Sequence, residues 1–494
     1  MKELPIRELL SGAEVLSPAL DSDIYEATAQ PVPMCTEYGE KALMFISDKI
    51  GGNDTDIDLS HLMGKAPIAV VVSGERKVTA SPCPIIRVKN VRSALALAVS
   101  RSCDIDYSKI KFIGVTGTNG KTTTATLIYK ILLGCGYKVG FIGTGKILSS
   151  KTLLSGDTYS MTTPDPTVLY PSIKRMEEDG CEFIIMEVSS HSIALGKIEP
   201  INFEYAIFTN LDNDHLDFHR NKEDYFLTKL KLFSKTETGL FNIDDEYGRR
   251  ASESAKCKRV TFGIIEKGDA YCTDVMLKSI SETSFFYREE NLIFKAESKL
   301  GGAFNVYNVM AALKCVIDLG VKPCIAKSML AEIDGIDGRL EVFDGRIKAI
   351  IDYAHTPMAF YNCLKTIKTN VNSKQNLIVV FGCGGNRDKD KRPLFGRYAE
   401  KFADTIIITE DNSRCESFNS IANDIAAGIE NKKFVKIKDR EKAIRYAFKT
   451  ASAGDVIAVI GKGHERYKII GDEYIPFDER QIIKDEINRI GERK

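Results

Sequence analysis

The stretch Lys111-Phe112-Ile113-Gly114-Val115-Thr116-Gly117-Thr118-Asn119-Gly120-Lys121-Thr122-Thr123 decides the fold of this chain. Residues 111–116 are typical of a buried strand, and residues 122–133 have a helical pattern that ends at Gly134, a residue type common at helix C-termini. The glycine-rich turn between them can bind phosphates, because backbone N–H groups and a helix N-terminus attract anions. This order of strand, turn and helix predicts an α/β unit with a parallel sheet.

The turn is close to the general phosphate-loop pattern without matching it fully. The pattern GxxxxGK[ST] requires glycine at position 115, where this chain has Val115. Lys121 would place its charge on the terminal phosphates of a nucleotide, and Thr122 would offer its hydroxyl to Mg²⁺. The alternative, a glycine turn with a solvated lysine, is disfavoured because the strand and the helix both stand where a phosphate loop needs them.

The pattern outside this stretch predicts three α/β domains. Residues 1–108 contain short apolar runs separated by glycine and proline, which is typical of a small α/β domain. Residues 109–336 alternate strands and helices around the glycine-rich turn. Residues 337–494 repeat the alternation in a doubly wound pattern. The strands expected in this last domain are residues 349–351, 377–381, 405–409 and 456–460.

Composition excludes several classes of protein. The 494 residues include 68 Lys plus Arg and 68 Asp plus Glu, so the formal net charge of zero argues against a generally basic nucleic-acid or membrane binder. The 12 cysteines are scattered singly without a CxxC pair, which argues against a zinc ribbon and favours reduced cysteines in a cytoplasmic protein. The first residues lack the apolar core of a signal peptide, and no window has 18 consecutive apolar residues, so no membrane span is expected.

Two polar segments of the central domain follow predicted strands. Glu187 directly follows the apolar run 183–186, where a carboxylate beside a phosphate loop can hold Mg²⁺. Residues 209–219 contain three aspartates and two histidines after another strand, which indicates a metal or phosphate site. A surface glutamate and a solvated acidic loop are the alternatives.

Four charged loops follow the strands of the last domain, at residues 352–357, 382–388, 410–414 and 461–465. Ligands bind at the carboxyl ends of the strands in open parallel sheets, so these loops predict a binding face. The mixture of Arg387, Arg414 and Glu465 suits a zwitterionic ligand such as an amino acid.

Two other functions fit parts of the sequence. Asn221-Lys222-Glu223-Asp224 matches the guanine-reading pattern NKxD of GTPases, but it does not end a buried strand, and no DxxG follows an apolar strand in the expected interval. A nucleotide-dependent scaffold would have no need for the four charged loops. Both are weaker explanations than an enzyme.

The motifs together resemble those of the Mur ligase family, the ATP-dependent amide-bond ligases of peptidoglycan precursor synthesis. The matching segments are residues 116–123, Glu187-Val188-Ser189-Ser190-His191, Asn210-Leu211, Asp214-His215-Leu216-Asp217, Phe304-Asn305-Val306-Tyr307-Asn308, Gly338-Arg339-Leu340-Glu341, Asp352-Tyr353-Ala354-His355-Thr356-Pro357 and Gly461-Lys462-Gly463-His464-Glu465. They are most similar to the members that add the third residue to UDP-N-acetylmuramoyl-L-alanyl-D-glutamate. The resemblance implies an N-terminal domain for the UDP end of that substrate, a central domain for ATP and a C-terminal Rossmann-like domain for the amino acid.

The resemblance also implies roles for individual residues. Lys121, Lys229 and His215 would be catalytic, and Thr122, Glu187, His215 and a carbamylated Lys229 would serve the Mg²⁺ ions. ATP would be bound by Gly117, Thr118, Asn119, Gly120, Lys121, Thr122, Thr123, Asn305, Arg339 and His355. The UDP-muramoyl dipeptide would be bound by Ser22, Thr162, Thr163, Ser189 and Lys197, and the amino acid by Arg387, Asp411, Asn412, Ser413, Arg414, Gly461 and Glu465.

The chain departs from the family at several of these positions. Asp23 replaces an arginine, Leu195 and Lys197 stand where other members place glutamine and arginine, and Ser413 replaces the proline of the Asp-Asn-Pro-Arg segment found in members that use meso-diaminopimelate. Since Arg414 is retained, we expect meso-diaminopimelate to be the diamino acid. L-Lysine as the amino acid and a folylpolyglutamate synthase-like ligase are the alternatives. We expect a cytoplasmic protein that acts as a monomer.

Overall fold

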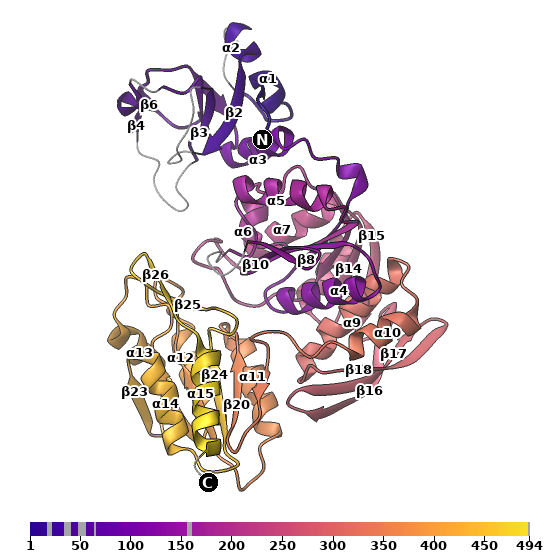
Figure 1. The fold of residues 1–494 in the computed structure, drawn as a ribbon, viewed down its shortest axis with the longest axis vertical. Coiled ribbons are helices and arrows are strands. Elements are labelled where there is room, and N and C mark those ends of the chain that lie inside the picture. Colours follow the sequence, from indigo (N-terminus) through magenta and orange to yellow (C-terminus); the bar gives the residue numbers. More distant parts are fainter. Residues whose placement is uncertain (17–21, 34–40, 48–55, 64–65, 156–160, 493–494) are drawn as a thin grey trace.

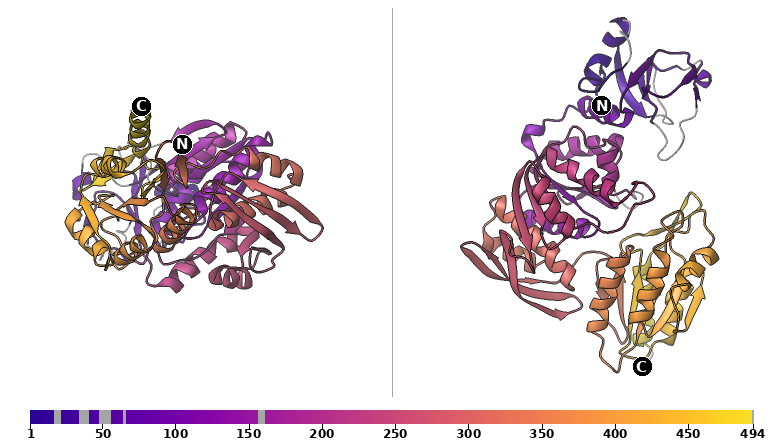
Figure 2. Two further views of the ribbon diagram at one scale, coloured as in Figure 1. Left: turned by 90° about the horizontal axis from the view of Figure 1, so that it is seen from below. Right: turned by 180° about the vertical axis from the view of Figure 1, so that it is seen from behind.

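The computed structural model describes residues 1–16, 22–33, 41–47, 56–63, 66–155 and 161–492. The chain forms three blocks that follow one another along the long axis of the molecule (Figure 1). Seen from behind, the N-terminal and C-terminal blocks lie at opposite ends, with the central block between them (Figure 2). Within the described ranges, the structure contains no helix with the length and apolar character needed to cross a membrane.

Among its described residues, the N-terminal block contains a five-stranded sheet and three α-helices. Its strands have the order β1 (Leu4–Pro5), β2 (Thr28–Pro33), β3 (Ala42–Phe45), β5 (Ala69–Ser73) and β7 (Ile85–Val88). The helices are α1 (Ile6–Leu9), α2 (Ser22–Glu26) and α3 (Val91–Ser102), and β4 (Ile57–Asp58) pairs with β6 (Val78–Ala80). Lys174 of the central block donates a hydrogen bond to the Asp104 carbonyl at 2.9 Å, next to the end of α3.

The central block is built on an 11-stranded sheet. The strand order is β11 (Thr152–Ser155), β10 (Lys146–Ser149), β9 (Val139–Gly143), β12 (Phe183–Glu187), β8 (Lys111–Thr116), β13 (Phe203–Phe208), β14 (Thr236–Asn242), β15 (Lys258–Gly263), β16 (Ala270–Ser279), β17 (Glu282–Glu289) and β18 (Leu292–Ser298). The strands from β9 to β16 are parallel. The helices are α4 (Lys121–Gly134), α5 (Pro166–Glu178), α6 (Ser190–Ala194), α7 (Lys222–Leu230), α8 (Glu246–Ser254), α9 (Ala303–Asp318) and α10 (Pro323–Ala331).

The C-terminal block is a six-stranded doubly wound sheet. Its strand order is β19 (Glu341–Phe343), β20 (Lys348–Asp352), β24 (Val456–Ile460), β21 (Leu377–Phe381), β22 (Thr405–Thr409) and β23 (Phe434–Ile437). Helices α11 (Pro357–Thr369), α12 (Arg392–Phe402) and α13 (Phe418–Ala426) pack on one face, and α14 (Arg440–Thr450) and α15 (Glu479–Glu492) pack on the other. The hairpin of β25 (Tyr467–Ile470) and β26 (Glu473–Pro476) follows β24.

The apolar runs explain why the two larger sheets are covered on both faces. All five residues of β12, of β21 and of β24 are buried, as expected for parallel strands between two layers of helices. The three-block α/β architecture predicted from the sequence is confirmed. The predicted domain boundaries near residues 108 and 336 stay a prediction. The helical pattern predicted for residues 225–233 is α-helical as far as Leu230 and continues as a 3₁₀ helix over Lys231–Lys235.

Candidate active site

The glycine-rich turn joins β8 to α4, as the sequence predicts. Gly120 precedes α4 with φ of 85°, and a Cβ at this position would lie 2.3 Å from Asn308 Oδ1. A Cβ at Gly117 would lie 1.9 Å from Thr209 Oγ1. Both positions therefore require glycine, and the loop packs closely against the segment after β13: the Thr118 N–H donates to the Asn210 carbonyl and the Asn119 N–H to Asn210 Oδ1, each at 2.9 Å.

Lys121 lies on the turn in this structure. Its ammonium donates hydrogen bonds to the carbonyls of Gly117 at 3.0 Å and of Thr118 at 2.8 Å. Desolvation lowers the pKa of Lys121, while the charges of Glu187 and Asp214 act in the opposite direction. The Lys121 side chain is thus held against the carbonyls of the glycine-rich turn.

Glu187 lies beside this turn because β12 and β8 are adjacent and parallel, with Glu187 opposite Val115. Thr122 Oγ1 donates to Glu187 Oε2 at 2.9 Å. Thr144, which the sequence analysis missed, donates to the same carboxylate through its backbone N–H at 3.0 Å and through its hydroxyl at 3.3 Å. The carboxylate of Glu187 and the hydroxyl of Thr122 are the oxygen donors that Mg²⁺ prefers, so these residues fit the ion.

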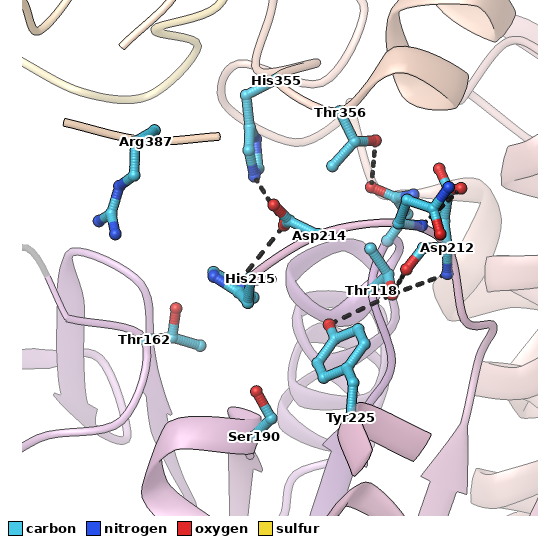
Figure 3. Close-up of polar contacts among 12 residues, drawn as sticks. Thr118, Thr162, Ser190, Asp212, Asp214, His215, Tyr225, His355, Thr356 and Arg387 are labelled. Atoms are coloured by element: carbon cyan, nitrogen blue, oxygen red, sulfur yellow. Dashed lines mark hydrogen bonds and ion pairs between the residues drawn. The ribbon is translucent and has the colours of Figure 1, made fainter. Parts of the chain in front are cut away.

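Asp214 is the centre of the polar segment that follows β13 (Figure 3). Its carboxylate lies 3.5 Å from His215 Nε2, 3.9 Å from His355 Nε2 and 3.7 Å from Lys391 Nζ. Burial favours the protonated acid, but the charges of His215, Lys391 and His355 outweigh it and hold the pKa of Asp214 below its usual range. Since His355 and Lys391 belong to the C-terminal block, Asp214 links the two blocks across the site.

His215 has a left-handed backbone conformation and lies at the cavity. Its φ is 55°, a backbone conformation that residues other than glycine seldom adopt, and its side chain lines the cavity described below. Desolvation lowers the pKa of His215, while the charge of Asp214 acts in the opposite direction. His219, from the same segment, is instead buried and bonded to Ser190 Oγ at 2.9 Å.

Lys229 lies behind the glycine-rich turn. Its side chain is 1% exposed, and its ammonium donates to the Gly117 carbonyl at 2.9 Å and lies 4.6 Å from the centre of the Tyr225 ring. Burial, with the nearby charge of Lys121, lowers the pKa of Lys229 well below its ordinary value.

In the part of the chain that the structure describes, no group of three or more His, Cys, Asp or Glu side chains is arranged to hold a metal ion.

The residues predicted for the amino acid come from the C-terminal block. Arg414, with φ of 49°, donates through Nη1 to the carbonyls of Gly385 at 3.0 Å and Asn412 at 3.3 Å. Burial and the like charge of Arg387 lower the pKa of Arg414. Arg387 itself lies 3.3 Å from Asp217 Oδ2 of the central block. Two neighbouring guanidinium groups are therefore present where the sequence predicts a carboxylate site.

A single cavity of about 770 Å³ connects these parts. The predicted residues that line it are Thr118, Asn119, Gly120, Lys121, Thr122, Thr123, Thr162, Glu187, His215, Arg339, His355, Arg387, Asp411, Asn412, Arg414, Gly461 and Glu465. The predicted residues Gly117, Thr163, Ser189, Lys197, Lys229, Asn305 and Ser413 are not among the lining residues. The Ser22 side chain lies outside the described residues.

Several of the residues outside the lining support those that form it. Thr163 Oγ1 donates to the Glu187 carbonyl at 2.9 Å, and its oxygen accepts the Ser189 N–H at 3.1 Å. Asn305 is 1% exposed and accepts a hydrogen bond from Asn308, the residue that does line the cavity. Lys197 is buried, and its ammonium lies 2.7 Å from Asp165.

The guanine-reading alternative does not fit the structure. Asn221 caps the N-terminus of α7, and its side chain accepts the backbone N–H of Asp224 at 2.9 Å. The match to NKxD is therefore the signature of a helix start, and neither Asn221 nor Asp224 lines the cavity.

Family models match most of the central and C-terminal blocks. The model of the Mur ligase middle domain matches residues 115–316, and the model described as Mur ligase, glutamate ligase domain matches residues 338–463. A UDP-N-acetylmuramoyl-L-alanyl-D-glutamate–2,6-diaminopimelate ligase of Clostridioides difficile is 38% identical over 461 residues, covering 91% of this chain and 93% of the relative. The protein of the same name from Aquifex aeolicus is 41% identical over 428 residues, covering 84% and 85%.

Solved structures give the same picture. A structure of a UDP-N-acetylmuramoyl-L-alanyl-D-glutamate–2,6-diaminopimelate ligase has a TM-score of 0.65 and 26% identity, and the match covers 99% of both chains. A folylpolyglutamate synthase of Mycobacterium tuberculosis, complexed with ADP and AMPPCP, has a TM-score of 0.59 and 14% identity over 74% of this chain and 89% of the other. The second likeness is one of fold alone.

Proposed function

The chain belongs to the Mur ligase family, and from this membership we propose that it is the ATP-dependent ligase that joins meso-diaminopimelate to UDP-N-acetylmuramoyl-L-alanyl-D-glutamate in peptidoglycan precursor synthesis. The observation that carries the proposal is the common cavity of about 770 Å³, which is lined by the phosphate-binding turn on one side and by Arg387, Arg414 and Glu465 on the other. ATP and the zwitterionic amino acid would thus be bound in the same cavity.

The turn at residues 117–123 would hold the phosphates of ATP. Its backbone N–H groups and the N-terminus of α4 attract anions, and Lys121 would leave the carbonyls of Gly117 and Thr118 to contact the terminal phosphates. Asn308, Arg339 and His355 line the same cavity and would complete the nucleotide site, with Asn305 supporting Asn308.

Glu187, Thr122 and His215 would hold the Mg²⁺ ions. When bound, Mg²⁺ neutralises the charge that gathers as a carboxylate and a phosphate approach each other. Lys229 would act with them in a carbamylated form, because its buried amine has a depressed pKa and the neutral amine is the form that adds CO₂. Carbamylation converts an ammonium without a lone pair into a group with carboxylate oxygens.

The reaction would proceed in two steps. The acceptor carboxylate attacks the γ-phosphate of ATP, so that an acyl phosphate forms and ADP leaves. The amine of the amino acid then attacks the acyl carbon, and phosphate leaves from the tetrahedral intermediate. Lys121 would stabilise the developing charge in the first step. Thr162 lines the cavity beside Glu187, while Thr163, Ser189, Lys197 and Ser22 would position the muramoyl dipeptide around it.

The guanidinium pair supports meso-diaminopimelate over L-lysine. Burial and then the like charge of Arg387 lower the pKa of Arg414, and a substrate carboxylate between the two guanidinium groups would relieve their repulsion. Meso-diaminopimelate has a distal carboxylate and L-lysine lacks it. A site that leaves a buried charged group unpaired should disfavour the smaller substrate by roughly 10⁴.

A phosphate-release assay tests the proposal. The protein is supplied with ATP, Mg²⁺ and UDP-N-acetylmuramoyl-L-alanyl-D-glutamate, and with meso-diaminopimelate or L-lysine in separate reactions, and the product is identified by mass. We expect phosphate release and a tripeptide product with meso-diaminopimelate. Comparable kcat/KM for L-lysine would overturn the choice of amino acid, and phosphate release only with a folate acceptor and glutamate would overturn the reaction.

A further inference from the structure

Lys462 is a buried lysine in the loop that follows β24. Its side chain is 0% exposed, although it lies between two residues that line the active-site cavity, Gly461 and Glu465. Gly461 has φ of 122° and Gly463 has φ of 55°. A Cβ at Gly463 would lie 2.5 Å from Tyr353 Cβ. The two glycines permit a turn that directs the Lys462 side chain inwards, under the amino-acid-binding loops.

The ammonium of Lys462 contacts three side chains of the expected amino-acid site. It lies 2.9 Å from Asn412 Oδ1, 3.0 Å from Glu465 Oε2 and 3.5 Å from Asp411 Oδ1. Asn412 Nδ2 donates to the same Glu465 oxygen at 2.9 Å, and Asn412 Oδ1 also accepts the Ile469 N–H at 3.0 Å. The contacts from Lys462 and Asn412 thus converge on Glu465 Oε2.

Building on the proposed function, we propose that Lys462 is a positioning residue for the incoming diamino acid: it holds the Glu465 carboxylate and the Asn412 amide in the orientation that receives the distal ammonium of the substrate. The charges of the cluster agree with this role. Lys462 is one cation between two carboxylates, Asp411 and Glu465, so the cluster keeps one negative charge for a substrate cation. Arg440, behind it, forms its own ion pair with Glu479.

The electrostatics of Glu465 depend on Lys462. Burial raises the pKa of Glu465 and the charge of Asp411 raises it further, whereas Lys462 lowers it. The other groups that face this cluster are Arg440, Arg414, Tyr353 and Tyr467. Without the ammonium of Lys462, Glu465 becomes a weaker acid and binds a cation only at higher pH.

The variant Lys462→Met tests the proposal. We expect the KM for meso-diaminopimelate to rise roughly 10- to 100-fold, since a buried charge-assisted contact is lost. The KM values for ATP and for the muramoyl dipeptide should stay within about twofold, because the phosphate-binding turn belongs to a different block. The acid limb of the pH profile of kcat/KM for meso-diaminopimelate should move to higher pH.

Lys314→Met is the matched control. Lys314 is also a buried, ion-paired lysine, with its ammonium 2.5 Å from Glu289 and 2.7 Å from Asp318, but it lies away from the cavity. We expect Lys314→Met to lower thermal stability without moving the acid limb. Lys462→Gln, which retains a hydrogen-bond donor but no charge, serves if the methionine variant does not fold, and it should show the same shift of the limb.

Two results would overturn the role of Lys462. One is a folded Lys462 variant whose KM for meso-diaminopimelate and acid limb equal those of the wild-type protein. The other is a limb shift that persists in full when Lys462→Met is combined with Glu465→Gln, because Glu465 would then not be the group that titrates. Both of these results require a wild-type protein that is active with meso-diaminopimelate. If the proposed function itself is wrong, the wild-type protein has no such activity, so the two failures can be told apart.

Discussion

At the scale of single residues, Lys229 offers a direct test of carbamylation. The structure places its amine 2.9 Å from the Gly117 carbonyl with a depressed pKa. We expect Lys229→Ala to lower kcat at least about 100-fold, since a charged group at the reacting phosphate is lost. Short carboxylic acids added to the assay should restore part of the activity by occupying the vacated space. Lys231→Ala, at an exposed position two residues further on, is the control and should retain full activity.

Arg414 is the residue whose loss should weaken the preference for meso-diaminopimelate over L-lysine. We expect Arg414→Ala to lower kcat/KM for meso-diaminopimelate roughly 100-fold, because a charge-assisted hydrogen bond to the substrate carboxylate disappears. The kcat/KM for L-lysine should change by less than about threefold, because L-lysine lacks the distal carboxylate that Arg414 would bind. The kcat/KM of Arg414→Lys for meso-diaminopimelate should lie between those of the wild-type protein and of Arg414→Ala, because lysine retains the charge but not the bidentate geometry of the guanidinium group. Equal losses for both amino acids would contradict the assignment.

At the scale of elements, an ion pair joins the start of α12 to the loop that carries Arg414. Arg392 is fully buried and bonds both oxygens of Glu416, each at 3.0 Å. The hydrogen bonds from Arg392 lower the pKa of Glu416 from 4.5 to about 2. The carboxylate therefore stabilises the fold above about pH 4.5, and that contribution is lost as the pH falls towards 2.

Glu416→Gln should show this dependence. Near pH 7 we expect the variant to lose about 1–3 kcal/mol of unfolding free energy relative to the wild-type protein, and the difference should shrink as the pH falls from about 4.5 towards 2. Chemical denaturation across this pH range measures it. Glu297→Gln is the control, because the pKa of Glu297 is also lowered to about 2 although its side chain is 48% exposed. The loss of unfolding free energy in this variant should stay below about 1 kcal/mol, since exposed ion pairs contribute little. A constant difference across the pH range would rule out the ion pair as its source.

At the scale of the whole molecule, the central and C-terminal blocks meet through polar contacts and a small apolar one, in which Ile280 and Phe304 of the central block pack against the C-terminal core. The polar contacts include Lys146 with Asp337 at 2.9 Å, Arg387 with Asp217 at 3.3 Å and Thr356 with Asn119 at 3.3 Å. Polar contacts of this kind are weak and sensitive to salt. The two blocks should therefore separate more easily than either block unfolds.

Limited proteolysis tests the predicted domain boundaries near residues 108 and 336. Lys109 and Glu332 are exposed close to them, so trypsin should cut first at Lys109 and a glutamate-specific protease first at Glu332. A non-hydrolysable ATP analogue should slow the cut at Glu332, because the cavity it would fill is lined by both blocks. Early cuts well inside the central or the C-terminal block, away from Lys109 and Glu332, would contradict the boundaries.

The sequence by itself determined the elements and the edge of each sheet on which the chemistry lies. The strand and helix around the glycine turn, the strands of the C-terminal block and the charged loops after them were all predictable, because apolar periodicity and glycine positions act over a few neighbouring residues. The family motifs likewise identified Lys121, Glu187, Arg414 and Glu465.

The tertiary structure decided which side chains meet. Only the adjacency of β12 and β8 brings Glu187 to Thr122, and only the placement of the blocks pairs Arg387 with Asp217 and Asp214 with Lys391. The contacts of Thr144 and Lys462 were missed for the same reason: Thr144 lies in no motif, and the motif at residues 461–465 does not show that the Lys462 side chain points inwards. Such contacts join residues tens to hundreds of positions apart, and the strand order and block positions that bring them together are not encoded in any local run of residues.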